Sequence, residues 1–257
     1  MEQRKRIYIF LTFFVCTASL ALLTVSLATH RWILAKPIRS VQINSSILDQ
    51  YHQNSDEDQR TLIEMPKKFR GLVYFGLFQG TKILNYGLGD RTTIIWLKQE
   101  MIRNPNLMSF NLWLLTIVSI SLAMIFGLVA AIFSIINTVM TPIEAITGVQ
   151  GLYLWNILAC IFGIGAAILW LVQFRTKLVW NVMTEDEQQD GWTSKNRASL
   201  SFSYYAVLVA LSLHLLNVLL IYYGTNHYRF ASGLIGRRQK DRSNGVDKHP
   251  EGLIMLY

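Results

Sequence analysis

Cysteine, histidine and clustered acidic residues are the side chains of this sequence whose chemistry could support catalysis or metal binding. The sequence has no zinc-type cysteine or histidine spacing, no phosphate-binding glycine loop and no nucleophile or metalloprotease motif. Gly87-Leu88-Gly89 matches part of a nucleotide-binding fingerprint but lacks its third glycine. The acidic run Glu185-Asp186-Glu187 is typical of a solvated loop, with a calcium site as the alternative. We therefore expect neither an enzyme nor a cofactor or metal site.

One histidine stands apart from the others because it lies within an apolar stretch. Ala210, His214 and Asn217 are spaced so that they share one face of a helix. An ionisable residue at membrane depth is a functional candidate by default, and a neutral histidine bonded to a neighbouring helix is the alternative. No second acidic or basic residue in the apolar stretches could extend a proton relay, which argues against a transporter.

Four long windows without Asp, Glu, Lys or Arg must position these residues. About 20 apolar residues in a helix cross a hydrocarbon core about 30 Å thick. Only 16% of the residues are charged, against about 25% in soluble domains. We predict an all-α membrane protein, a claudin-like four-helix transmembrane bundle, with spans at residues 7–29, 110–136, 149–174 and 198–224. For the first window, a cleaved signal peptide is the alternative to a retained span.

Basic residues flank the windows and predict the orientation of the chain. The segments between and beyond the spans are a head (1–6), a long loop (30–109), a turn (137–148), a second loop (175–197) and a tail (225–257). Arg4, Lys5 and Arg6 in the head and six Lys or Arg residues in the tail place both termini in the cytoplasm. The basic termini would then be attracted to the anionic headgroups of the lipid bilayer. This explains the net charge of +8, and we expect no nucleic-acid partner.

The long first loop carries two further signals. Aromatic and β-branched residues at 71–78, and the stretch at 41–43, predict a small extracellular β-sheet. Asn44 belongs to the one N-x-[ST] sequon of the sequence, which predicts glycosylation there. At the other end of the chain, Met255, Leu256 and Tyr257 could add as a strand to a PDZ-type groove, with an ordinary apolar terminus as the alternative.

Small residues recur at every fourth position in spans two and three and predict close helix packing. Contacts within one bundle are the favoured interpretation, and a homo-oligomer interface is the alternative. The two ridges are Ser119, Ala123, Gly127 and Ala131, and Ala159, Gly163 and Ala167.

Several short motifs, in matching order and spacing, make the chain resemble the clarin family of tetraspan proteins related to claudins. The match begins with a tryptophan after the first span and includes GLFxG, GLGxR and GxxGLYL motifs and the His-Leu-Leu-Asn of span four. The motif residues are Trp32, Gly76, Leu77, Phe78, Gly80, Gly87, Gly89, Arg91, Gly148, Gly151 and Tyr153. Unlike claudins, the first loop has no cysteine pair, so the expected sheet must hold by packing alone.

The resemblance implies a non-catalytic plasma-membrane protein of sensory cell projections, connected with the perception of sound and light. Its role would be to organise membrane and cytoskeletal complexes by scaffolding, trafficking or adhesion. The implied partners are other membrane proteins and PDZ or actin-linked adaptors. An auxiliary subunit that modulates an ion channel is the alternative function.

Overall fold

The computed structural model describes residues 2–39, 69–140, 146 and 148–246. Within these ranges four helices are long and apolar enough to cross a membrane, which confirms the prediction of four such helices. They are α1 (Glu2–Ala28), α5 (Phe110–Val139), α6 (Val149–Gln173) and α8 (Phe202–Val246), with a five-residue π-helical extension of α6 at Phe174–Leu178. The chain is therefore a mostly helical, multi-pass membrane protein.

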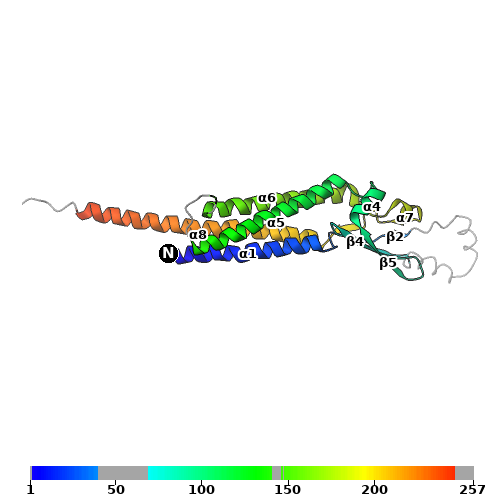
Figure 1. The fold of residues 1–257 in the computed structure, drawn as a ribbon, viewed down its shortest axis with the longest axis horizontal. Coiled ribbons are helices and arrows are strands. Elements are labelled where there is room, and N and C mark those ends of the chain that lie inside the picture. Colours follow the sequence, from blue (N-terminus) through cyan, green and yellow to red (C-terminus); the bar gives the residue numbers. More distant parts are fainter. Residues whose placement is uncertain (1, 40–68, 141–145, 147, 247–257) are drawn as a thin grey trace, which may run out of the picture.

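The four helices lie side by side along the long axis of the molecule (Figure 1). Helix α1 packs against α5 and α8, and α6 packs against the same two helices. Serine hydroxyls join α1 to α8: Ser19 donates to the carbonyl of Ala210 (3.1 Å) and Ser26 to that of Ser203 (2.8 Å). At the end of the bundle where α1 begins, α8 extends well past the other helices (Figure 1).

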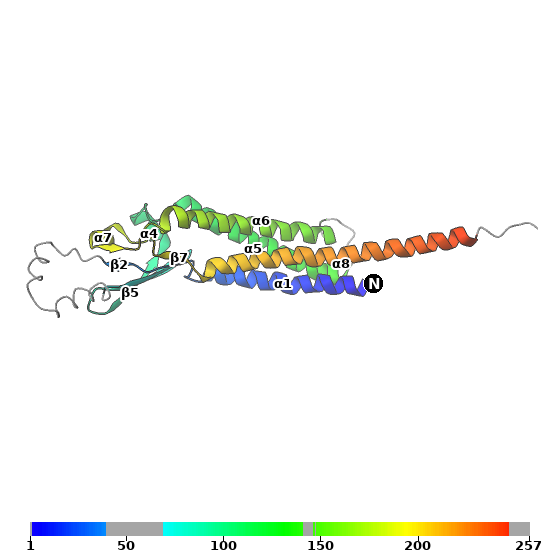
Figure 2. The ribbon, with the colours of Figure 1, turned by 180° about the vertical axis from the view of Figure 1, so that it is seen from behind.

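A second layer, which we call the cap, covers the other end of the bundle (Figures 1 and 2). Within the described residues it comprises seven strands and two short helices, α4 and α7. The strands are β1 (Ile33–Ala35), β2 (Ile38–Arg39), β3 (Gly71–Phe75), β4 (Gln79–Asn85), β5 (Asp90–Trp96), β6 (Trp192–Thr193) and β7 (Ala198–Leu200), and the helices are α4 (Leu97–Arg103) and α7 (Glu185–Gln189).

The main sheet of the cap is antiparallel, with strand order β5-β4-β3-β1-β7, and β2 pairs with β6 in a separate two-stranded sheet. Alternating burial along β4, where Gly80, Lys82 and Leu84 point inward, is the pattern of a strand with one covered face. A small sheet is present as predicted, but it is not built from the first loop alone. Strand β7, which comes directly before α8, pairs with β1 in the register Ile33↔Leu200.

The boundary of the last span differs from the one expected. Residues 198–200 form β7, and the helix begins at Phe202 instead of Ala198. The backbone explains the shift, because β1 offers an open edge to this segment and the N–H of Ser201 donates to the carbonyl of Trp32 (3.0 Å). Pairing with β1 satisfies backbone groups that would otherwise be left at the helix N-terminus.

Candidate functional site

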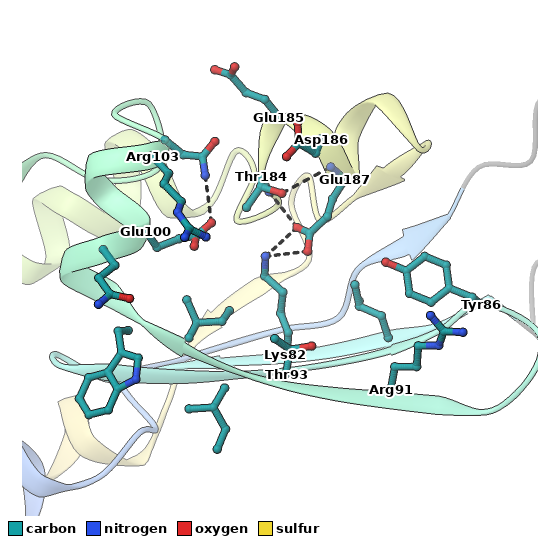
Figure 3. A pocket seen from close by; sticks show the side chains of 16 residues that line it. Lys82, Tyr86, Arg91, Thr93, Glu100, Arg103, Thr184, Glu185, Asp186 and Glu187 are labelled. Carbon is teal, nitrogen blue, oxygen red and sulfur yellow. Dashed lines mark hydrogen bonds and ion pairs between the residues drawn. The ribbon is translucent and has the colours of Figure 1, made fainter.

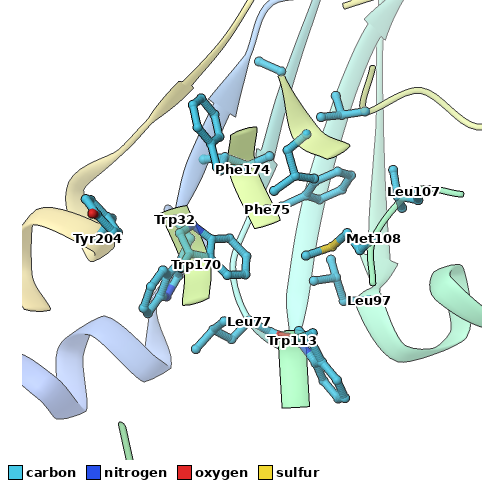
Figure 4. Packing of buried hydrophobic residues seen from close by; sticks show 14 of the residues in the cluster. Trp32, Phe75, Leu77, Leu97, Leu107, Met108, Trp113, Trp170, Phe174 and Tyr204 are labelled. Carbon is cyan, nitrogen blue, oxygen red and sulfur yellow. The ribbon is translucent and has the colours of Figure 1, made fainter. Parts of the chain in front are cut away.

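A tryptophan-rich core fixes the cap to the bundle (Figure 4). Trp32, after α1, and Trp170, in α6, are fully buried and meet edge to face with ring centroids 5.0 Å apart. The Trp32 indole N–H donates to the carbonyl of Ser26 (2.8 Å), and that of Trp113 in α5 donates to the carbonyl of Leu77 (2.7 Å). Large side chains on or beside α1, α5 and α6 therefore hold the cap, and the indole N–H groups of Trp32 and Trp113 are bonded to backbone carbonyls.

The Gly-Leu-Phe-Gln-Gly motif forms the turn between β3 and β4. The N–H of Gly76 donates to the carbonyl of Gln79 (2.8 Å), and a Cβ on Gly76 would lie 2.7 Å from the carbonyl oxygen of Thr29. A Cβ on Gly80 would overlap the ring of Phe75. Leu77 is fully buried, whereas 47% of Phe78 is exposed. Gly76 therefore lets the turn lie directly on the end of α1, and Gly80 leaves room for the Phe75 ring. The two apolar residues between the glycines have different environments.

The Gly-Leu-Gly-Asp-Arg motif forms the hairpin between β4 and β5. Gly87 and Gly89 both have positive φ (+97° and +116°), the conformation that glycine adopts without strain. The Asn85 side chain accepts from the N–H of Gly87 (2.8 Å) and donates to Asp90 (3.0 Å). The motif is thus explained by turn geometry, and nothing about it requires a nucleotide.

An open groove of about 740 Å³ lies between the inner face of β4 and β5 and helices α4 and α7 (Figure 3). Across it, the Lys82 ammonium contacts both carboxylate oxygens of Glu187 at 2.7 Å. The Lys82 side chain is 6% exposed and that of Glu187 is 18% exposed. Glu187 also closes the N-terminus of α7 in a capping box with Thr184. This ion pair ties the sheet to the segment that joins α6 and α8.

Aromatic and cationic side chains surround one end of the same groove. Arg91 and Arg39 lie over the ring of Tyr86, with guanidinium carbons 5.8 and 6.0 Å from its centroid, and Trp192 meets that ring edge to face at 5.5 Å. Burial raises the pKa of the Tyr86 hydroxyl, and the charges of Glu187 and Asp190 raise it further. A water-accessible groove with both charge signs and an aromatic wall is suited to binding a polar segment.

The acidic run of the sequence is placed on α7 at the rim of this groove. Glu187 forms the ion pair with Lys82, and Glu185 accepts a hydrogen bond from the Asn106 side chain (3.4 Å). Asp186 lines the groove. Within the described ranges no group of three or more His, Cys, Asp or Glu residues could hold a metal ion. The ion pair and the hydrogen bond of these carboxylates hold α7 against the sheet and the neighbouring segment.

Inside the bundle, a buried polar cluster joins three helices. Oδ1 of Asn156 (α6) lies 3.0 Å from Nδ1 of His214, 3.2 Å from Nδ2 of Asn217 and 3.6 Å from Sγ of Cys16. Nδ2 of Asn217 is also 3.0 Å from that sulfur. The structure thus places His214 and Asn217 together, and adds two residues that sequence reasoning missed. Asn156 could have been found, because it is an amide within a charge-free window.

The small-residue ridges lie inside the bundle. Ala123, Gly127 and Ala131 of α5 are buried and Ser119 is half-buried, while Ala159, Gly163 and Ala167 of α6 are all buried. A Cβ on Gly127 would lie 3.2 Å from the His214 ring, and one on Gly163 would overlap Leu211. Both ridges therefore face neighbouring helices of the same chain.

The remaining predicted residues fall into two groups. Gly148 precedes the first residue of α6, Gly151 lies directly against the backbone of Ile146, and the Tyr153 hydroxyl lies 3.1 Å from that of Thr225 on α8. Asn44 and the terminal Met255, Leu256 and Tyr257 lie outside the described residues.

Comparison with known proteins connects these features to one family. The Clarin-2-like family model matches residues 4–184, which covers α1 from its third residue, the cap motifs, α5, α6 and Thr184 of the capping box. Human Clarin-2 is 26% identical over 157 residues, and mouse Clarin-2 is 25% identical over the same length; each alignment covers 56% of this chain and 66% of the relative. Mouse Clarin-3 is 23% identical over 161 residues, covering 62% of this chain and 70% of the relative. The matched region thus spans just under two thirds of the Clarin-2 relatives.

Proposed function

The chain belongs to the Clarin-2-like family, and from that premise we propose that it organises membrane complexes of sensory cells without catalysing a reaction. Its role is to hold partner membrane proteins at the cell surface, as a scaffold, in trafficking or in adhesion. No catalytic family is indicated by the comparisons. Lys82, Glu187 and Tyr86, which line the groove, form an ion pair, a helix cap and ring contacts, and these contacts fix the shape of a binding surface.

The observation that carries this proposal is the groove between the sheet and α7. It is framed by segments distant in sequence, and the Lys82–Glu187 pair holds these segments in one geometry. A preformed groove loses little conformational freedom when a partner binds. The tryptophan core below the groove fixes the cap to the transmembrane helices. A partner bound at the cap is therefore also held in a fixed position relative to the bundle.

The proposed location is the plasma membrane, with the cap outside the cell and both termini in the cytoplasm. The start of α1 and the projecting part of α8 lie at the same end of the bundle, opposite the cap (Figure 1). The basic residues of the head and tail then lie on the cytoplasmic side, in agreement with the positive-inside rule.

A glycan at Asn44 is part of the same proposal. It predicts that Asn44→Gln removes a glycosidase-sensitive shift of the protein band on a gel. If glycosidase does not shift the wild-type band, the extracellular placement of the first loop loses this support.

The cytoplasmic partners proposed are PDZ or actin-linked adaptors that bind the tail. The tail ends in Leu-Tyr and carries clustered basic residues, features that suit strand addition to a PDZ groove and attraction to anionic lipid. Deleting the last three residues should therefore release an adaptor while leaving the partners of the cap in place.

The test of the proposed function fills the groove with a large side chain and measures which neighbouring proteins are lost. Thr93 lines the groove, whereas Thr92 is the adjacent residue of the same strand and points to the other face. Proximity labelling from a cap-side tag in sensory cells should show cap neighbours for the wild type and for Thr92→Trp, and should lose them for Thr93→Trp. Equal surface delivery of the two variants is the control for folding. Unchanged neighbours in Thr93→Trp would refute the groove as the binding surface.

A further inference from the structure

A second, apolar groove lies where the cap meets the membrane end of α1. It has a volume of about 360 Å³ and is lined by Thr24, Leu27, Ala28, His30, Phe78, Gln79 and Trp96. The first three of these residues belong to the candidate span Arg6–Ala28. The other four belong to the cap or to the link that leads into it. The groove therefore crosses the level at which the hydrocarbon of a bilayer gives way to its headgroups.

Two exposed aromatic residues form the cap side of this groove. Phe78 is 47% exposed and Trp96 is 54% exposed, although the neighbouring Leu77 and Leu97 are fully buried. Exposed large aromatic residues are costly in water, and tryptophan is favoured at membrane interfaces, where its ring contacts apolar groups and its N–H meets headgroups. The placement of Phe78 and Trp96 thus indicates contact with lipid.

The wall behind the groove is rigid. The β3–β4 turn lies on the end of α1 so closely that a Cβ on Gly76 would be 2.8 Å from the Cα of His30. The carbonyl of Phe78 accepts the N–H of Leu97 (3.0 Å), which fixes the end of β5 beside the turn. A groove whose walls are held by backbone contacts keeps its shape when it is empty, and a chain that enters it need not remodel the protein.

We propose that this groove binds one phospholipid of the cap-side leaflet. Its acyl chain lies against Leu27 and Ala28, and its headgroup lies beside His30 and Gln79. The surrounding bilayer supplies this occupant, because the groove is continuous with the membrane face of α1. The lipid fills the gap between α1 and the sheet and so joins the cap to the membrane. The site shares Trp96 with the Lys82–Glu187 groove but is otherwise lined by different residues, and it does not depend on the proposed function.

The test counts the lipids that stay on the purified full-length protein. The wild type is reconstituted in phosphatidylcholine vesicles, extracted in mild detergent and weighed by native mass spectrometry. Ala28→Phe places a ring in the groove and should lose one retained phosphatidylcholine per protein. Ala21→Phe is the matched control, because Ala21 is an exposed residue of the same helix face two turns deeper and does not line the groove.

A second variant guards against misfolding of Ala28→Phe. Phe78→Ala removes an exposed wall of the groove and should lower retention of the same lipid, while its thermal unfolding stays close to that of the wild type. An equal lipid count in the wild type, Ala28→Phe and Phe78→Ala would overturn the proposal, and so would a wild type that retains no lipid. Thr93→Trp should keep the full count, so failure of the proposed partner groove is distinguished from failure of the lipid site.

Discussion

The cap and the centre of the bundle both depend on a buried polar contact between distant segments, but they use different chemistry. In the cap, Lys82 and Glu187 form an ion pair beside a water-accessible groove. In the bundle, Asn156, His214, Asn217 and Cys16 meet without any Asp, Glu, Lys or Arg. A charge at the centre of a bilayer costs about 2.5–3.5 kcal/mol even on insertion scales, whereas neutral groups that bond to one another avoid that cost. The solvent around each region explains which residues join its segments.

The two regions also differ in the contacts that stabilise them in place of a disulfide. Both cysteines are free and buried in helices, so no disulfide supports the described part of the cap. The described part of the cap relies on a tryptophan core and the Lys82–Glu187 ion pair, while the bundle relies on close backbone approach at small residues. Removing one partner of the ion pair should therefore cost more than removing one hydrogen bond of the bundle.

Lys82→Met gives the largest expected effect, because it leaves the largely enclosed Glu187 carboxylate without its cation. Breaking a buried pair costs about 3–5 kcal/mol, and the partial exposure of Glu187 reduces this to about 2–3 kcal/mol. The measurement is thermal unfolding of the purified protein followed by tryptophan fluorescence. Lys98→Met, at an exposed position on α4, is the matched control and should change little.

The double variant Lys82→Met/Glu187→Met sharpens the same comparison. Since both charges are then absent, it should recover part of the stability that Lys82→Met loses. A double variant that is less stable than Lys82→Met by the full cost of Glu187→Met would show that the two side chains are not coupled.

Gly163→Leu is the next largest change and tests the bundle. A Cβ at this position overlaps Leu211 of α8, and overpacking costs about 1–3 kcal/mol. We expect reduced surface delivery and a lower unfolding temperature. Gly165→Leu provides the control, because the nearest atom to a Cβ there is the Ser119 hydroxyl at 4.0 Å. Equal damage from both variants would mean that the tight approach of α6 to α8 is not what matters.

The sequence predicts the bundle better than the cap, and the reason is physical. Long uncharged windows identify spans because only lipid tolerates them, and glycine motifs predict tight turns. The Lys82–Glu187 pair joins positions far apart in the chain, and nothing in the sequence indicates which lysine meets which carboxylate. The pairing of β7 with β1 was missed for the same reason. The roles of Asn156 and Cys16 follow from helix rotation, which a charge-free window does not determine.

A smaller effect is expected from the polar cluster. Asn156→Leu removes the oxygen that lies within bonding reach of His214, Asn217 and Cys16. Hydrogen bonds between transmembrane helices average about 0.6 kcal/mol and reach about 1.7 kcal/mol. A double-mutant cycle of Asn156→Leu with His214→Leu, read by unfolding in detergent, should give a coupling free energy of about 1 kcal/mol. Strict additivity of the two variants would contradict a direct bond.

The smallest expected effect is a change in the pKa of Tyr86, which reports on the electrostatics of the cap groove. Burial, and then the charges of Glu187 and Asp190, raise its pKa above the ordinary value of 10.0. The native state thus holds this proton more tightly than the unfolded chain does, so its contribution to stability is present below pH 10.0 and is lost as the pH rises through the native pKa. Subtracting the ultraviolet titration of Tyr86→Phe from that of the wild type isolates this hydroxyl. Glu187→Gln should lower its pKa, because one of the two nearby negative charges is removed. A titration of Tyr86 that ignores Glu187→Gln would mean that the carboxylate does not face this end of the groove, and the groove would then have two independent ends.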